Sequence, residues 1–459
     1  MGNGEITGNT NEGDITSTSK VQSIYAGGIT SYVDDSAIIL TNNSQENASD
    51  VKIGEGNLYV CAGGIVGYIG DEVYSLTFDF VGEEINLAGS VYAGNGEAQA
   101  TADISAGALV GQTDSPLTIN NVHYDGTVTC DITNTTTGNY YSFGGLVGRA
   151  TVPITISSSS CVGKVDIAAK AITKAKLTFG GIVGLAEAGI TISNCSSSMD
   201  IKYSANTPSK SNGYPSHMGG IVGRILMGKS SIENCTNQGS LYNRLYNNNL
   251  YIDLGGSTVG KMNMAAGILG SYGYLSTLGS SDTITIKNCT NANHINAYRG
   301  GVAGIVGYIY NGEVDGCTFA TGNLADSINS YAGGIAAIAY NCTVTNCTVT
   351  TTIKSTPQGS LYIRQGGIVA WARGNTTVSG CSYYGSLSYS PSAYDDFSGG
   401  IVGLAQDDEV VVENCRYGGT VNSVAITASN CTEYAVGKAS KEGWESTPTV
   451  TGIELWNGK

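Results

Sequence analysis

One five-residue pattern recurs at least ten times along the 459-residue chain: two small residues, two aliphatic residues and a further small residue. A pattern that returns at a regular period is typical of a repeat protein in which each repeat packs only against its neighbours. Successive copies lie 30 to 47 residues apart, and a partial copy begins at Gly27. We therefore expect one elongated solenoid. The copies begin at Gly63, Gly107, Gly144, Gly180, Gly219, Ala266, Ala303, Gly333, Gly366 and Gly399.

A second block follows each copy and alternates apolar with polar residues. It commonly ends in Asn-Cys, as in residues 190–195 and 284–289. Alternation with a period of two, in segments rich in β-branched residues, indicates a half-buried strand. A third block follows the cysteine, as in residues 235–241. We expect an all-β, right-handed parallel β-helix (a β-solenoid) of 11–12 coils, with about three strands per coil.

The residue before the cysteine is Asn in five copies and Gly in two. These two residue types share a tolerance of positive φ. The pattern therefore predicts a left-handed residue at a corner of each coil. Because coils stack, the Asn side chains are predicted to form a hydrogen-bonded ladder.

The repeats occupy residues 1–438, which we assign to a single solenoid with a worn twelfth copy at residues 435–437. Residues 439–459 contain Trp444, Pro448 and Trp456 and break the pattern. We expect this segment to form a C-terminal cap over the final coil, which would block end-to-end association.

Composition excludes several classes of protein. A net charge of −15 argues against a nucleic-acid-binding or anionic-lipid-binding protein. The apolar runs are too short to span a bilayer. The chain begins inside a repeat, without a charged segment followed by an apolar one, and we interpret this as an export signal already removed. We expect a monomer located outside the cell or on its outer surface.

Eight of the twelve cysteines are assigned to one repeat position, and Val122 occupies that position in another copy. A position that accepts valine favours buried free thiols in the core. Disulfides between neighbouring coils and a metal site remain alternatives. We expect no cofactor and no metal. The eight are Cys161, Cys195, Cys235, Cys289, Cys317, Cys347, Cys381 and Cys415.

The recurring pattern resembles the GLUG motif of bacterial surface proteins. Residues 145–148 (GLVG) match it literally, and the isoleucine copies match it with a conservative change. The resemblance covers nearly the whole chain and implies a large exported protein, similar to streptococcal immunoglobulin A peptidases and adhesin-like proteins. Those peptidases carry a separate zinc domain with H-E-x-x-H. Here none of His123, His217 and His294 is followed by Glu, so peptidase activity is not implied.

Differences in repeat length are concentrated between the cysteine and the next copy of the pattern, so we expect the insertions to emerge along one edge. Tyrosines beside Asn, Ser and Arg in these insertions are typical of recognition surfaces. The alternative is that the tyrosines only cover the edge of the solenoid. The predicted ligand-binding residues are Tyr203, Tyr214, Tyr242, Arg244, Tyr246, Tyr251, Tyr389 and Tyr394.

Four aromatic residues share one slot, four residues after the second small residue of the pattern: Tyr32, Tyr68, Tyr308 and Trp371. Aromatic side chains at equivalent positions stack on neighbouring strands. We therefore interpret this slot as structural.

The favoured function is a non-enzymatic, adhesin-like protein that binds a host glycan or an extracellular protein. The first alternative is a polysaccharide lyase or hydrolase that uses acids such as Asp253, Asp395 and Asp396. The second is a purely structural spacer. Acids that follow the pattern, such as Asp114 and Asp407–Asp408, suggest a calcium site only weakly, because isolated acids in turns are usually solvated. Clusters of threonine at residues 135–137 and 350–352 are not periodic, which argues against ice binding.

Overall fold

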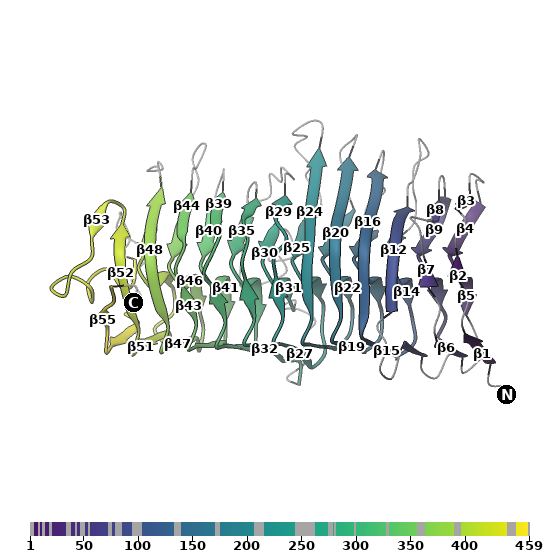
Figure 1. Ribbon diagram of the computed structural model, residues 1–459. Helices are drawn as coiled ribbons and strands as arrows, with labels where there is room; N and C mark the ends of the chain where they lie inside the picture. The colour runs from purple at the N-terminus through teal and green to yellow at the C-terminus, as the bar shows by residue number, and fades with distance from the viewer. Residues whose placement is uncertain are drawn as a thin grey trace.

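The computed structural model describes residues 4–7, 10–11, 14–17, 21–33, 38–41, 44–45, 51–53, 56–71, 76–78, 85–93, 103–132, 139–169, 175–205, 215–243, 262–273, 279, 281–297, 300–326, 330–355, 363–389, 396–437 and 447–457. Among these residues there is no helix, and the strands stack in parallel, coil upon coil, into an elongated β-solenoid (Figure 1). The predicted all-β parallel solenoid is confirmed. Each complete coil contributes strands to four sheets in a constant order, and we number the sheets 1 to 4 in that order.

The strands of each sheet are as follows. Sheet 1 contains β4 (Val21–Gly27), β9 (Gly56–Gly63), β13 (Asp103–Gly107), β17 (Tyr140–Gly144), β21 (Lys176–Gly180), β25 (Ser216–Gly219), β30 (Met264–Ala266), β35 (Gly300–Ala303), β40 (Ser330–Gly333), β45 (Arg364–Gly366) and β49 (Phe397–Gly399). Sheet 2 contains β5 (Thr30–Val33), β10 (Val66–Ile69), β14 (Val110–Thr113), β18 (Val147–Ala150), β22 (Val183–Ala186), β26 (Val222–Ile225), β31 (Leu269–Tyr272), β36 (Val306–Tyr310), β41 (Ala336–Tyr340), β46 (Val369–Arg373) and β50 (Val402–Ala405). Sheet 3 contains β11 (Leu76–Phe78), β15 (Leu117–Asn120), β19 (Ile154–Ser157), β23 (Ile190–Ser193), β27 (Ser230–Glu233), β32 (Ile284–Lys287), β37 (Gly312–Asp315), β42 (Thr343–Thr345), β47 (Thr377–Ser379), β51 (Val411–Glu413) and β54 (Thr449–Thr451).

Sheet 4 contains longer strands in the first half of the chain and pairs of short strands in much of the second half. Its strands are β2 (Thr10–Asn11), β3 (Ile15–Ser17), β7 (Ser44–Gln45), β8 (Val51–Ile53), β12 (Ile85–Ala93), β16 (Val122–Ile132), β20 (Ser160–Ala169), β24 (Ser196–Ala205), β28 (Thr236–Asn237), β29 (Leu241–Asn243), β33 (Thr290–Asn291), β34 (Ile295–Ala297), β38 (Thr318–Phe319), β39 (Asn323–Asp326), β43 (Thr348–Val349), β44 (Thr352–Ser355), β48 (Ser382–Tyr389), β52 (Arg416–Val421) and β55 (Glu454–Leu455). Beside these, β53 (Val424–Ala425) pairs antiparallel with β52, and β1 (Gly4–Thr7) pairs with β6 (Ile38–Thr41).

Sheets 1, 2 and 3 contain eleven strands each among the described residues, in agreement with the predicted 11–12 coils. The five-residue pattern supplies two strands rather than one, because the chain bends in its middle. β17 ends at Gly144 and β18 begins at Val147. The amides of Leu146 and Val147 both donate to the carbonyl of Ile182 in the next coil, at 2.9 and 3.0 Å. This bend converts the three strands expected per coil into four.

The second small residue of the pattern is glycine in every copy that begins between Gly144 and Gly399, and a side chain of sheet 4 lies directly opposite the bend. A Cβ atom on Gly367 would lie 2.5 Å from the ring of Tyr383, and one on Gly400 would lie 1.9 Å from the ring of Tyr417. Both rings are fully buried. The bend therefore leaves the space that the largest core side chains fill.

The last small residue of the pattern lies against the backbone of sheet 1 in the preceding coil. A Cβ atom on Gly184 would come within 2.6 Å of the amide nitrogen of Phe143. One later coil has Ala337 at this position, and Gly301 lies opposite it, so that a Cβ added to Gly301 would be 3.1 Å from that of Ala337. In this pair of coils the close approach of sheets 1 and 2 is possible because Gly301 lacks a side chain.

The predicted left-handed corner between sheets 3 and 4 is confirmed in every copy that the sequence identified. The φ angle is 55° at Asn194, 54° at Asn234, 51° at Asn288 and 63° at Gly316. The Asn ladder is confirmed in three successive coils: the Asn234 amide donates to Asn194 at 3.2 Å, and the Asn288 amide donates to Asn234 at 3.3 Å. Gly316, which has no side chain, ends the ladder.

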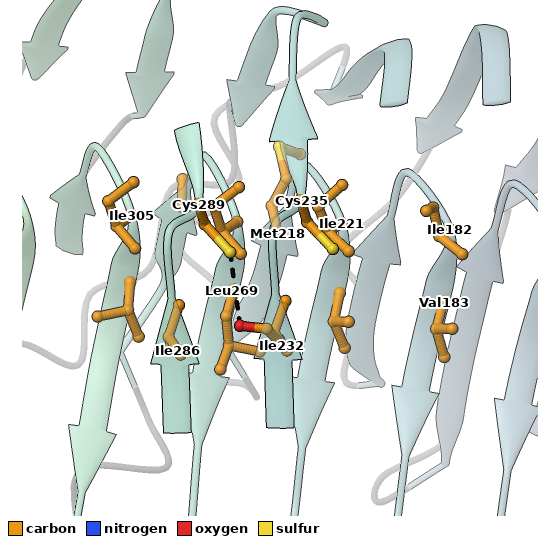
Figure 2. Close-up of a cluster of buried hydrophobic side chains, with 14 of the residues drawn as sticks. Ile182, Val183, Met218, Ile221, Ile232, Cys235, Leu269, Ile286, Cys289 and Ile305 are labelled. Atoms are coloured by element: carbon orange, nitrogen blue, oxygen red, sulfur yellow. Dashed lines mark hydrogen bonds between the residues drawn. The ribbon is translucent and has the colours of Figure 1, made fainter. Parts of the chain in front are cut away.

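The main core lies inside the coil and consists of in-register aliphatic columns. Ile154 pairs with Ile190, and Ile156 pairs with Ile192. Figure 2 shows the same arrangement further along, where Ile232 and Ile286 project into the interior from neighbouring coils. Parallel pairing places identical positions next to each other, so a column of similar side chains packs continuously along the axis.

A second core lies between the outward faces of sheets 1 and 2, and we call it the lateral core. The ring of Tyr331 in sheet 1 stacks on Trp371 in sheet 2, with ring centroids 5.4 Å apart. The guanidinium of Arg364 lies 4.4 Å from the centre of the Trp371 ring. Its apolar members are Met262, Met264, Ala266, Ala303, Tyr308, Tyr331, Ala337, Ile338, Ala370, Trp371, Phe397 and Leu404.

The four aromatic residues of the predicted slot belong to one in-register column of sheet 2 that faces the lateral core. Tyr32 and Tyr68 stack on each other at 5.3 Å, which confirms the structural interpretation for this pair. Ile338 lies between Tyr308 and Trp371 in this column, so these two rings do not stack on each other. Both rings instead pack in the lateral core with residues of sheet 1.

The middle of the lateral core is polar. The guanidinium of Arg149 forms ion pairs with Asp103 and Glu187, which belong to two different coils. His217 is 2% exposed, and its Nδ1 lies 2.8 Å from the hydroxyl of Ser271. Burial lowers the pKa of His217 below its usual value, and the nearby Arg224 cation lowers it further. The imidazole is therefore neutral in the folded protein.

Of the segment predicted as a C-terminal cap, the structure describes residues 447–457, and these add two strands to the solenoid. β54 adds to sheet 3 and β55 adds to sheet 4, while Val436 bridges to Val402 in sheet 2. The Trp456 ring lies under the guanidinium of Arg416, at 4.9 Å. The final coil thus covers the strands that precede it.

Substitution of Gly184 by alanine is expected to destabilise the coils around it by about 1–3 kcal/mol, because the new methyl group meets backbone atoms that cannot rotate away. Hydrogen exchange of peptides from β17 and β21 measures this local stability. The matched control is Ala337→Gly, which removes a methyl group at the equivalent position and should cost less than about 1 kcal/mol. Equal protection in wild type and Gly184→Ala would contradict the packing argument.

Acidification is expected to destabilise the protein through His217. In the unfolded chain the imidazole has its ordinary pKa of about 6.5. The contribution of neutral His217 to the free energy of unfolding is fully present above about pH 6.5. It is lost as the pH falls below that value, by up to about 1.4 kcal/mol per pH unit. Urea unfolding at pH 7 and pH 5 measures the loss, which should be smaller in His217→Gln. A pH dependence in His217→Gln as steep as in the wild-type protein would refute the assignment.

Candidate functional site

Most of the length variation of the chain falls in the connections that leave sheet 4. Every strand that leaves sheet 4 is followed by the first strand of the next coil in sheet 1, so each of these connections lies between the same two sheets. β16, β20 and β24 extend furthest toward this edge, which is at the top of Figure 1. We call it the variable edge. Insertions that share one edge of a repeat protein often form its binding surface.

Tyr242 is the predicted site residue that the structure places best for contact with a ligand. It lies in β29 near the variable edge, on the outward face of sheet 4, and is half-buried. Its in-register neighbours are Lys202, which is exposed, and Asn296. A ring flanked by an ammonium group and an amide combines a flat apolar face with hydrogen-bond donors.

Tyr389 lies at the end of β48, also half-buried. Burial raises the pKa of Tyr389, and the carboxylate of Asp396 raises it further. Asp396, one of the acids required by the hydrolase alternative, is itself only 7% exposed. The structure therefore brings Tyr389 and Asp396 together but leaves little of this carboxylate open to a substrate.

Tyr203 was predicted to bind a ligand, but the structure places it in the core. It is 1% exposed, and its ring stacks on Phe179 with centroids 5.7 Å apart. The insertion that begins after Cys195 first continues as β24, whose alternate side chains point inward. Sequence reasoning treated the whole segment as a loop and missed this strand.

The other predicted site residues lie outside the described residues. They are Tyr214, Arg244, Tyr246, Tyr251 and Tyr394. The same holds for the acids Asp253 and Asp395 of the hydrolase alternative.

The described acids that follow the five-residue pattern make contacts within the fold. Asp114 accepts hydrogen bonds from the Tyr68 hydroxyl, the Gln112 amide and the Thr151 hydroxyl. Asp407 forms an ion pair with Arg373 at 3.0 Å. In the described part of the chain, no three His, Cys, Asp or Glu side chains converge as ligands for one metal ion.

Seven of the eight cysteines assigned to one repeat position do occupy it, and they form one column in consecutive coils. Cys161 does not: it pairs with Tyr124 and Ser197, two residues further along sheet 4, and Ser159 takes the place in the column. Because side chains alternate in a strand, Cys161 still points inward. The column, which we call the cysteine column, consists of Cys195, Cys235, Cys289, Cys317, Cys347, Cys381 and Cys415.

All twelve cysteines are buried free thiols in this structure, in agreement with the favoured interpretation. Burial raises the pKa of Cys161 and of Cys381, which keeps these thiols protonated. Figure 2 shows Cys235 and Cys289 projecting into the core from neighbouring coils. The cysteine column therefore packs as part of the hydrophobic core.

Sheet 3 carries a feature that the sequence analysis missed. The sequence analysis considered only the threonine clusters at residues 135–137 and 350–352, because variable repeat lengths hide the period of this sheet until the copies are aligned strand by strand. The outward column of sheet 3 then reads Thr118, Thr155, Thr191, Ser231, Thr285, Glu313, Thr343, Thr377, Val411 and Thr449. The hydroxyl groups are interrupted at Val411 and at Glu313, which forms an ion pair with Lys287.

No helix among the described residues has the length and apolar character needed to cross a membrane.

Comparison with known proteins identifies the repeat. No curated protein and no solved structure shows significant similarity to the chain. The family model described as the GLUG motif matches residues 177–202 and 328–354. Each match begins near a sheet 1 strand and ends in sheet 4, so it spans most of one coil. The chain therefore carries the GLUG motif at two places, one in each half of the solenoid.

Proposed function

We propose that this protein is a non-enzymatic binding protein of the cell surface or the extracellular space. In this proposal the solenoid is a rigid support, and the variable edge contacts a glycan or an extracellular protein. The observation that carries the proposal is the row formed by Lys202, Tyr242 and Asn296 on the outer face of sheet 4 beside that edge. The GLUG matches and the solenoid fold fit a structural or surface-type repeat protein.

The chemistry of this row suits a sugar. A tyrosine ring offers an apolar face to the C–H groups of a pyranose, while an amide and an ammonium group bond to its hydroxyls. These three residues come from three consecutive coils, which lie about 4.8 Å apart in a parallel sheet. An extended ligand that crosses the coils would contact all three. We propose that the protein binds as a monomer, since one solenoid presents the complete row.

Replacement of Tyr242 by alanine is expected to weaken glycan binding about tenfold, because loss of one aromatic contact costs about 0.5–1.5 kcal/mol. The measurement is a titration of the best ligand from an array of glycans and matrix proteins. Tyr384→Ala is the matched control, since Tyr384 is an exposed tyrosine of the same sheet. It should bind like wild type.

Two results would contradict the proposal. If both variants bound like wild type, the row at Tyr242 would not be the site. If the wild-type protein bound nothing on the array at high micromolar concentration, the spacer alternative would replace a binding function.

A further inference from the structure

The seven thiols of the cysteine column share one geometry. Each Sγ lies 3.1–3.5 Å from the carbonyl oxygen two residues earlier in its own coil, as between Cys289 and Lys287 or between Cys347 and Thr345. Cys289 also points at the carbonyl of Ile232 in the preceding coil, at 3.5 Å (Figure 2). The same interaction recurs in five other members. The sulfur atoms therefore lean along the solenoid axis, each toward the coil before it.

This orientation brings each thiol next to its neighbour. The Sγ of Cys317 lies 3.4 Å from the amide nitrogen of Cys289 in the preceding coil. Strands of a parallel sheet are about 4.8 Å apart, and in-register side chains repeat at that distance. The cysteine column is thus a line of sulfur atoms with a regular spacing.

We propose that the cysteine column binds soft monovalent d10 metal ions such as Cu(I), each held in linear coordination by two cysteines of adjacent coils. A linear ion places its two sulfur ligands twice one metal–sulfur bond apart. With a bond of about 2.3 Å, as in zinc thiolates, that separation is about 4.6 Å. It agrees with the spacing of the coils.

The surroundings favour this class of ion. Thiolates select soft ions such as Cu(I), whereas Zn²⁺ requires four ligands in a tetrahedron. A line of sulfur atoms cannot supply a tetrahedron, and in the described residues no group of three or more His, Cys, Asp or Glu side chains converges on one point. A two-coordinate ion between stacked sulfur atoms also needs no preformed cavity. Each ion replaces two thiol protons, which are released, and no oxidation state changes.

Linear pairing makes a specific prediction for a line of seven ligands. If each thiol joins only one ion, seven thiols hold three ions and one thiol remains over. Removal of the first, third, fifth or seventh cysteine leaves segments that still hold three ions. Removal of the second, fourth or sixth leaves only two. The effect of a substitution therefore alternates along the column, and a set of independent thiols would not behave in this way.

The test counts bound Ag⁺, used as the probe, by native mass spectrometry of the folded protein under reducing conditions. Cys235→Val removes the second member and should lose one ion relative to wild type. Cys289→Val removes the third member and should lose none. Cys342→Val is the control outside the column. Thr343 pairs with Glu313 and Thr377, so the neighbours of Cys342 in adjacent coils are Gly312 and Thr376, and neither is a cysteine. Cys342→Val should also lose none.

Valine is the suitable replacement, since Val122 occupies the equivalent position in an earlier coil. Circular dichroism checks that each variant has the wild-type fold. The proposal is overturned if the wild-type protein binds no Ag⁺, or if all three variants lose one ion each, which is the result for independent thiols. Uptake of Zn²⁺ at the same stoichiometry as Ag⁺ would also exclude linear coordination.

Discussion

In-register parallel pairing is the constraint on which the rest of this structure depends. Each backbone hydrogen bond between coils fixes one residue directly beside its equivalent in the next coil, about 4.8 Å away. Every side chain then meets a copy of its own position. Apolar positions become continuous columns such as Ile154 and Ile190, and polar corners become ladders such as Asn194 and Asn234. A residue type that packs poorly against a copy of itself would lower the stability of every coil that contains it.

The glycines of the recurring pattern determine where the chain bends between sheets 1 and 2 and where these two sheets come into contact. In the recurring pattern one glycine leaves space for a core ring such as Tyr383, and another lets sheet 2 lie against the backbone of sheet 1. The pair Ala337 and Gly301 shows that the requirement belongs to the contact, not to one residue, because the missing side chain can be on either partner. The lateral core is a consequence of this close approach, and it allows outward-facing residues such as Trp371 to be buried.

The sequence predicted those features that depend on one position repeated many times. The corner residues Asn194 and Gly316 were identifiable because both tolerate positive φ, and the number of coils followed from counting the pattern. Contacts between different positions could not be predicted in this way. The burial of Tyr203, the pairing of Arg149 with two carboxylates and the burial of His217 all depend on which faces of sheets 1, 2 and 4 are covered. Alignment on the alternating block of sheet 3, as between residues 154–157 and 190–193, would have revealed the threonine column and would have separated Cys161 from the cysteine column.

The separation between a constant frame and a variable edge has a consequence for how such a protein changes over generations. All four sheets repeat in register, while most of the differences in length fall in the connection from sheet 4 to sheet 1. A duplication or deletion of one whole coil therefore joins strands that already match, wherever along the axis it occurs. The number of coils can therefore change by one at a time during evolution. The length of the solenoid changes with it, while the packing of the core within each coil stays the same.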